Sequence, residues 1–262
     1  MKILSINGSY RKNGNTAQIL EMVASKMQQI ALDEQQPIEL EIVNLGHQGI
    51  QFCRGCRVCF DIGENKCSLD DDLLAIREKM QAADGLILAS PVYVNDVNGI
   101  TKNWIDRLAF VCHRPAFAGK SAYLIATVGI GPTSHAIKTM KMALSTWGYQ
   151  IAGQASFKMG ARMKKEAAET QFQEQTHKIA SNLFSSVQQQ DFVKPSFISL
   201  MTFRIQQGYW QRRPQDESLD HSYWRNQGWT KPKRDFYTSH KAGKTKVALA
   251  RLVGTILTPF FT

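Results

Sequence analysis

The sequence predicts an α/β fold in which helices cover both faces of a parallel sheet. Residues 1–187 alternate five short apolar segments with five segments whose apolar residues recur at helical spacing. This alternation is typical of a doubly wound sheet, because right-handed crossovers return each helix to the sheet. The composition of 43% hydrophobic and 21% charged residues is that of a globular protein and excludes collagen-like, disordered and disulfide-scaffold classes.

The five apolar segments are short and end in glycine, proline or polar residues, as strands do. The first ends at Gly8. The third ends at Pro91, which has no backbone donor and is expected to stop the sheet. The expected strands are residues 2–7, 38–43, 84–91, 121–128 and 149–157.

A helix is expected after each strand. Asn15 and Thr16 offer caps for the first helix, and residues 70–72 offer carboxylates for the second. The remaining expected helices are residues 99–112, 134–147 and 164–187. Ligands of such sheets bind at the carboxyl ends of the strands. The candidate loops are therefore residues 8–16, 44–70, 91–98 and 128–134.

The first of these loops carries groups that suit a phosphate. A helix N-terminus presents free N–H groups and the positive end of the helix dipole. The hydroxyls of Ser9 and Thr16, the amide of Asn15 and the guanidinium of Arg11 fit the same role. The loop matches neither a Walker P-loop nor the G-x-G-x-x-G fingerprint, so an ordinary capped turn is the alternative.

The loop after the third strand carries an aromatic residue at the edge of the sheet. Tyr93 follows Pro91 and Val92, and Asn95 comes two residues later. An aromatic ring and nearby backbone amides can hold a planar heterocycle by stacking and hydrogen bonding. A surface loop with an incidental tyrosine is the alternative.

Four of the five cysteines lie within 15 residues, in the spacing C-x2-C-x2-C-x7-C. The chain shows no signal peptide, so we expect a cytoplasmic protein with reduced thiols. Four thiolates suit a [4Fe–4S] cluster or zinc, and the compact spacing favours the cluster. An empty remnant and a redox-active dithiol are the alternatives. The candidate ligands are Cys53, Cys56, Cys59 and Cys67, with Arg54 and Arg57 to offset their charge.

Together, these motifs resemble the flavodoxin-like NADPH-dependent FMN reductase family and, within it, the iron–sulfur flavoproteins. The resemblance covers about residues 1–187 and implies a flavodoxin-like sheet of five parallel strands in the order 2-1-3-4-5. It rests on the first loop, Cys-Arg-Gly-Cys-Arg-Val-Cys, Ser-Pro-Val-Tyr, and then Gly99, Lys102, Asp106 and Arg107, all in the family's order and spacing.

The resemblance implies an FMN site at the sheet edge. The phosphate would be held by Ser9, Arg11, Asn15 and Thr16. The isoalloxazine ring would be lined by Pro91, Val92, Tyr93 and Asn95, although many members carry glycine at the last position. The loop that closes the site would contain Thr127, Gly129 and Gly131. The resemblance also implies NAD(P)H as hydride donor and a homodimer or homotetramer.

The leading hypothesis is an FMN-dependent oxidoreductase that takes hydride from NAD(P)H onto flavin N5. Electrons would pass to a quinone, another acceptor or an iron–sulfur cluster. No side chain is assigned as catalytic, because the flavin carries the chemistry. One alternative is an electron-transfer flavoprotein reduced by a protein donor such as ferredoxin. The other is a cofactor-free binding protein on the same frame.

Residues 188–262 differ in composition from the predicted FMN-binding domain of residues 1–187. They hold 12 of the 25 aromatic residues, and their net charge is +7 against +3 for the rest. We expect a basic, irregular extension that ends in an amphipathic helix near 243–257. That helix could lie on an anionic membrane, but packing on protein is favoured. An acidic redox partner fits the charge, whereas no recognisable module supports nucleic-acid binding.

Overall fold

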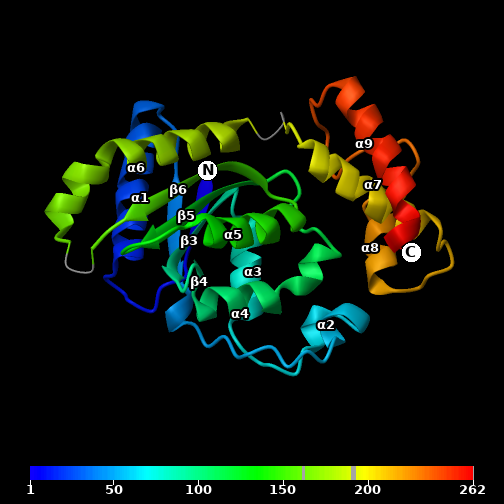
Figure 1. The fold of residues 1–262 in the computed structure, drawn as a ribbon, viewed down its shortest axis with the longest axis horizontal. Coiled ribbons are helices and arrows are strands. Elements are labelled where there is room, and N and C mark those ends of the chain that lie inside the picture. Colours follow the sequence, from blue (N-terminus) through cyan, green and yellow to red (C-terminus); the bar gives the residue numbers. More distant parts are fainter. Residues whose placement is uncertain (161–162, 190–192, 262) are drawn as a thin grey trace.

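The computed structural model describes residues 1–160, 163–189 and 193–261. Its centre is a parallel sheet in the order β2-β1-β3-β5-β6 (Figure 1). These five strands reproduce the predicted order 2-1-3-4-5. A short strand, β4 (Asp96–Val97), pairs antiparallel with β3 and was not predicted. The parallel strands are β1 (Lys2–Asn7), β2 (Glu39–Asn44), β3 (Gly85–Tyr93), β5 (Ser121–Val128) and β6 (Gln150–Lys158).

The sheet is buried on both faces because alternate residues of its central strands enter two separate cores. In β3, Leu86 and Leu88 enter one core, whereas Ile87 and Ala89 enter the other. The first core is covered by α3 (Leu73–Ala82), α4 (Gly99–Arg107) and α5 (Ser134–Thr146), and the second by α1 (Asn15–Asp33) and α6 (Lys165–Gln188).

Two sequence expectations about this region are wrong. The third strand does not stop at Pro91: it continues to Tyr93, and Pro91 is in register with Thr127 of β5. The helix expected over residues 99–112 ends at Arg107, and a 3₁₀ turn follows over Ala109–Cys112. Apolar residues are buried in the α-helix and in the 3₁₀ turn alike. Apolar spacing alone therefore did not locate the residue at which the α-helix ends.

The C-terminal extension is helical, which corrects the expectation of an irregular segment. It contains α7 (Phe197–Gln211), α8 (Leu219–Asn226) and α9 (Lys244–Leu257), of which only the last was predicted. A third hydrophobic core joins them, with Phe203, Trp224 and Trp229 at its centre. No helix in the described ranges combines the length and apolarity that a membrane span requires.

Candidate functional site

The loops after β1 and β3 are held together at the carboxyl edge of the sheet. A Cβ on Gly8 would lie 2.0 Å from Thr101 Oγ1 and 3.2 Å from the Ala89 carbonyl oxygen, so only glycine fits. The Gly8 carbonyl accepts a hydrogen bond from Asn98 Nδ2 at 2.6 Å. Because Asn98 caps α4, this bond joins the predicted phosphate loop to that helix.

Two of the predicted phosphate-binding side chains are buried at this edge. Ser9 is buried, and its Oγ accepts a hydrogen bond from the Arg11 backbone N–H at 3.0 Å. The Thr16 hydroxyl lies 2.7 Å from the Thr127 hydroxyl. This pair links the start of α1 to the end of β5. Arg11, the third of the predicted phosphate-binding residues, is exposed.

Asn15 and Thr16 do not cap α1, contrary to the sequence expectation. The N-cap is Gly14, and both residues lie in the first turn of the helix. Asn15 Nδ2 instead donates to the Met159 carbonyl at 3.0 Å, which ties α1 to the segment after β6. No described side chain caps α1. The first-turn amides are therefore suited to an anion.

The predicted ring-binding segment forms the β3–β4 hairpin. Tyr93 lies at the carboxyl edge of the sheet, as expected, but as the last residue of β3 itself, and it is 55% exposed. Val94 and Asn95 make the two-residue turn, with φ of +49° and +66°. Two positive φ values define a type I′ turn, which matches the twist of a hairpin. A β-branched valine is strained in this conformation.

The loop after β5 approaches the hairpin through its glycines. Gly131 has φ of +101°, and a Cβ on it would lie 4.0 Å from Asn95 Oδ1. A Cβ on Gly129 would lie 4.0 Å from the Met159 carbonyl oxygen. The structure thus brings all three groups of predicted FMN-contacting residues to one edge of the sheet.

All four clustered cysteines line one cavity of about 390 Å³ beside α4. Cys53 and Cys56 are exposed, whereas Cys59 and Cys67 are half-buried. Burial raises the pKa of Cys59, and the negative charge of the other three thiolates adds to the rise. Within the described parts of the chain, no three metal-ligating side chains converge as a single-ion site would require. The fifth cysteine, Cys112, is also half-buried and packs against the first core, outside this cavity.

Arg107 of α4 holds both ends of the cysteine segment. Its side chain is 3% exposed and binds the Asp71 carboxylate in bidentate fashion, at 2.5 and 3.2 Å. It also donates to the Gln51 carbonyl at 2.8 Å, and its Nη2 lies 4.0 Å from Cys67 Sγ. Burial acts to raise the pKa of Asp71, but hydrogen bonds from Arg107 and two backbone amides outweigh it and lower that pKa.

The expected charge-balancing role fits Arg107 better than Arg57. The guanidinium of Arg57 pairs with Asp61 at 3.1 Å and lies over the Phe60 ring, within its own short helix α2 (Val58–Asp61). The sequence singled out Arg107 only through the family resemblance. Its burial near Cys67 depends on a contact across 40 positions, which local spacing cannot reveal.

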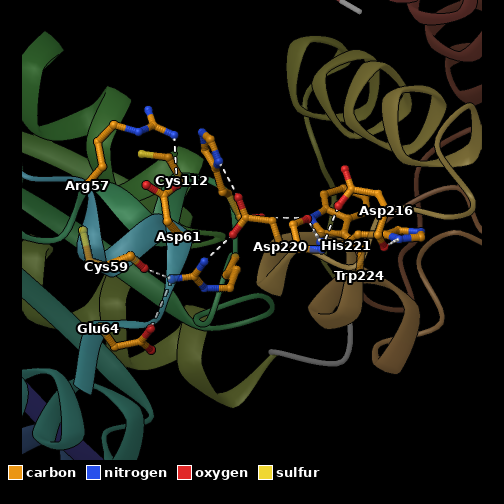
Figure 2. A network of polar contacts seen from close by, with 12 residues as sticks. Arg57, Cys59, Asp61, Glu64, Cys112, Asp216, Asp220, His221 and Trp224 are labelled. Carbon is orange, nitrogen blue, oxygen red and sulfur yellow. Dashed lines mark hydrogen bonds and ion pairs between the residues drawn. The ribbon is translucent and has the colours of Figure 1, made fainter. Parts of the chain in front are cut away.

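The middle of the cysteine segment is held by Arg114, which is buried and makes three separate contacts. Its guanidinium donates to the Cys59 carbonyl at 2.6 Å, pairs with Glu64 at 3.1 Å, and pairs with Asp220 of α8. Asp220 also accepts from His113 Nδ1 at 2.7 Å. Figure 2 shows Asp220 projecting from the extension toward the cysteine segment. Arg114 bonds to both Asp220 and the Cys59 carbonyl, and so connects the two parts.

Known proteins resemble this chain over its N-terminal part. The family model described as NADPH-dependent FMN reductase matches residues 1–163. An iron–sulfur flavoprotein of Archaeoglobus fulgidus is 32% identical over 156 residues, which are 59% of this chain and 67% of the relative. A second iron–sulfur flavoprotein of that organism is 39% identical over 107 residues, 41% of this chain and 48% of the relative. The chain therefore spans about half to two thirds of their length.

A solved structure titled flavone reductase has the same fold, with a TM-score of 0.57 and 16% sequence identity. The match covers 72% of this chain and 63% of that chain. At this identity the likeness concerns the fold alone. The family match, in contrast, extends over more than half of the sequence and includes the first loop, the cysteines and the hairpin. The chain belongs to the NADPH-dependent FMN reductase family, a family of flavin-dependent oxidoreductases.

Proposed function

We propose that this chain takes hydride from NAD(P)H onto bound FMN and passes the electrons through a [4Fe–4S] cluster to an external acceptor. The observation that supports this best is the role of α4. Its N-cap, Asn98, binds the predicted phosphate loop, and its last residue, Arg107, lines the cysteine cavity. Nine residues of helix span only about 13 Å, so the two predicted sites are neighbours.

The residues at the sheet edge fit FMN. Bound FMN would supply N5 as the hydride acceptor and can release electrons singly. Its phosphate would be held by the first-turn amides of α1 together with the side chains of Ser9, Arg11 and Thr16. Asn15 would act through its backbone, because its amide side chain is bound to Met159. The ring would lie against Pro91–Asn95, with Thr127, Gly129 and Gly131 at the adjacent strand end.

The cysteine cavity fits a cluster better than a single zinc ion. Zinc draws four thiolates to one point at about 2.3 Å each. A cubane binds each thiolate to a different iron, so its ligands stand further apart around a larger volume. Cys53, Cys56, Cys59 and Cys67 line one cavity of about 390 Å³, which supports the larger group. Arg107 would offset the negative charge next to Cys67.

The donor, the acceptor and the assembly are parts of the same proposal. NAD(P)H and a homodimer or homotetramer are proposed from the family, and a quinone is one candidate acceptor. Residues 1–187 are proposed as the FMN-binding domain, to which residues 188–262 are appended. The family match ends at residue 163, so the extension is argued from its own contacts.

Anaerobic purification with flavin and iron quantitation tests the cofactors. We expect about one FMN and four irons per chain, with a broad visible absorption beside the flavin bands. Cys56→Ser should lose the iron and keep the flavin. Cys112→Ser is the matched control, since Cys112 lies outside the cavity, and it should keep both. Flavin without iron would reduce the proposal to a simple FMN reductase, and a chain that takes up no FMN would support the cofactor-free alternative.

Stopped-flow bleaching of the flavin tests the donor. We expect NADH or NADPH to bleach the bound flavin in the anaerobic holoprotein. Bleaching by reduced ferredoxin and by neither nicotinamide would contradict the reductase proposal and support an electron-transfer flavoprotein.

A further inference from the structure

Helix α9 has an inverted distribution of side-chain sizes. Its buried residues are Ala250 and Gly254, both small. Its large apolar residues Leu249, Leu252 and Ile256 are 54%, 59% and 59% exposed. A surface helix of a globular protein normally turns its large apolar residues toward the core, so α9 is the reverse of the expected arrangement.

The close approach of α7 explains why small residues occupy the tightest part of the inner face of α9. A Cβ on Gly254 would lie 2.9 Å from Arg204 Cβ and 3.0 Å from the Met201 carbonyl oxygen. One turn further, a Cβ on Gly208 of α7 would lie 2.7 Å from Thr258 Oγ1. Larger side chains have no space at positions 250 and 254, whereas Val247, nearer the start of the helix, packs against the extension core.

The large apolar residues form one continuous stripe on the outer face. At about 100° per residue, positions 249, 252 and 256 project within about 60° of one another, on the side opposite 250 and 254. Phe260 and Phe261, which follow in a 3₁₀ turn, are 80% and 62% exposed. We call Leu249, Leu252 and Ile256 the apolar stripe. Single exposed apolar residues are ordinary, but a contiguous set marks an interaction site.

The surroundings of the apolar stripe are positively charged. Residues 241–261 contain four Lys or Arg and no Asp or Glu, within an extension of net charge +7. Arg251 is turned to the protein, where it donates to the carbonyls of Pro232 and Arg234. Lys244 and Lys246 are exposed at the start of the helix, and Lys246 lies about 60° from Leu249 around the helix axis.

We propose that α9 binds the surface of an anionic phospholipid bilayer, lying parallel to it. The apolar stripe would enter the boundary between headgroups and acyl chains, and the lysines would meet the lipid phosphates. Small residues facing a neighbouring helix and large apolar residues facing outward are the arrangement of helices that contact lipid. α9 lies in the extension, at the end of the molecule away from the sheet (Figure 1). Helix α9 does pack on protein, as the sequence-based preference expected, but it does so through its inner face and leaves the apolar stripe exposed.

Charge complementarity favours lipid over a second copy of this chain. A symmetric pair of α9 helices would bring two cationic segments together with no carboxylate in either. An anionic bilayer supplies the opposite charge and an apolar layer at the same surface. The stripe would remain unused in binding to a nucleic acid.

Vesicle flotation with the full chain tests the proposal. Vesicles of phosphatidylcholine and phosphatidylglycerol, in about a 3:1 ratio, should carry the protein upward, and vesicles of phosphatidylcholine alone should not. Raising the salt concentration should weaken the binding, because the lysines are exposed and screened. Failure to float with the anionic vesicles at low salt would overturn the proposal.

Substitutions of exposed residues separate the apolar contribution to membrane binding from the electrostatic contribution, because none of them alters a hydrophobic core. Leu252→Glu with Ile256→Glu should lower vesicle partitioning by more than about tenfold, and so should Lys244→Glu with Lys246→Glu. The matched control is Leu32→Glu at the end of α1, where the side chain is 73% exposed. It should float like the wild type, and circular dichroism should show all three variants folded.

Two further outcomes would overturn the proposal. One is that the stripe variants float as well as the wild type. The other is a concentration-dependent dimer that Leu252→Glu abolishes, in a chain that does not float. Neither result depends on bound flavin or iron, so the membrane proposal and the proposed function fail independently.

Discussion

Gly8 lies where β1 leaves the sheet, and its missing side chain lets three segments meet. Gly8→Ala would place a Cβ 2.0 Å from Thr101 Oγ1, so the loop or α4 must shift. We expect a loss of about 1–3 kcal/mol in the free energy of unfolding and weaker FMN retention. Chemical denaturation and flavin fluorescence measure the two effects. Gly99→Ala is the control: its Cβ would meet no heavy atom within 4 Å, so neither quantity should fall.

The buried ion pair between Arg107 and Asp71 should give a pH-dependent contribution to stability. The pKa of Asp71 is lowered from its ordinary value of 3.8, so the pair stabilises the fold above that value and loses this effect as pH falls through the lowered pKa. We expect Asp71→Asn to cost about 3 kcal/mol near neutral pH, because Arg107 is left buried and unpaired. The difference from wild type should narrow below about pH 4 in denaturation series.

An exposed pair on the same segment provides the control for this measurement. The Arg57 and Asp61 side chains are 71% and 55% exposed, so Asp61→Asn should change stability by less than about 0.5 kcal/mol. If both carboxylate variants lost the same stability at every pH, Arg107 would not be the anchor that its contacts indicate.

Individual residues differ in how far the sequence could predict their roles. The four cysteines were identified by their spacing, and the structure places all four around one cavity. Asn98 and Arg114 were not identified. Asn98 acts on a carbonyl 90 positions away, and Arg114 on groups 50 to 106 positions away. Only folding brings residues so far apart in the sequence into contact, and a single Asn or Arg has no local sequence pattern that would reveal such a contact.

At the scale of elements, the β3–β4 hairpin carries strain at its tip. Val94 has φ of +49° and is 99% exposed, so its conformation is held by the turn and not by packing. Val94→Asn should raise the free energy of unfolding by about 0.5–1 kcal/mol, because asparagine tolerates the left-handed region that valine resists. Thermal denaturation checks the direction. A destabilised variant would show that the Val94 side chain has a partner outside the described contacts.

The strand elements were predictable and the first extension helix was not. Short apolar segments bounded by glycine and polar residues locate the five parallel strands to within two residues at each end. In α7, the buried positions include Gln207 and Gly208 as well as Leu200 and Phe203. Gln207 binds the carbonyls of residues 229, 231 and 234, so a polar residue occupies the core-facing side. An apolar-periodicity argument therefore missed the helix.

At the scale of the whole molecule, Asp220 couples the extension to the remainder of the chain. Asp220→Ala would leave Arg114 without one of its two carboxylates, at an expected cost of about 2–4 kcal/mol. Three of the five tryptophans belong to the extension core. We therefore expect tryptophan fluorescence to change at lower denaturant than far-ultraviolet circular dichroism in this variant, whereas the two transitions coincide in the wild type.

The control for Asp220→Ala lies in the same segment. Glu217 is exposed and should be replaceable by alanine with both transitions still coincident. Coincident transitions in Asp220→Ala would show that Trp224 Nε1, bonded to the His113 carbonyl, and its neighbouring contacts suffice to couple the two parts.

The network around Arg114 also predicts which residues should occur together among relatives of this chain. Arg77 and Arg114 face Glu64 and Asp220, so the cluster has two positive and two negative groups. Since α8 supplies one of the carboxylates, a relative that lacks the extension would keep two cations against a single anion beside its cysteines. We expect position 114 to be neutral in such relatives and arginine to appear there together with an acid at position 220. The arginine at position 114 and the acid of α8 should therefore have been acquired, and should be lost, together.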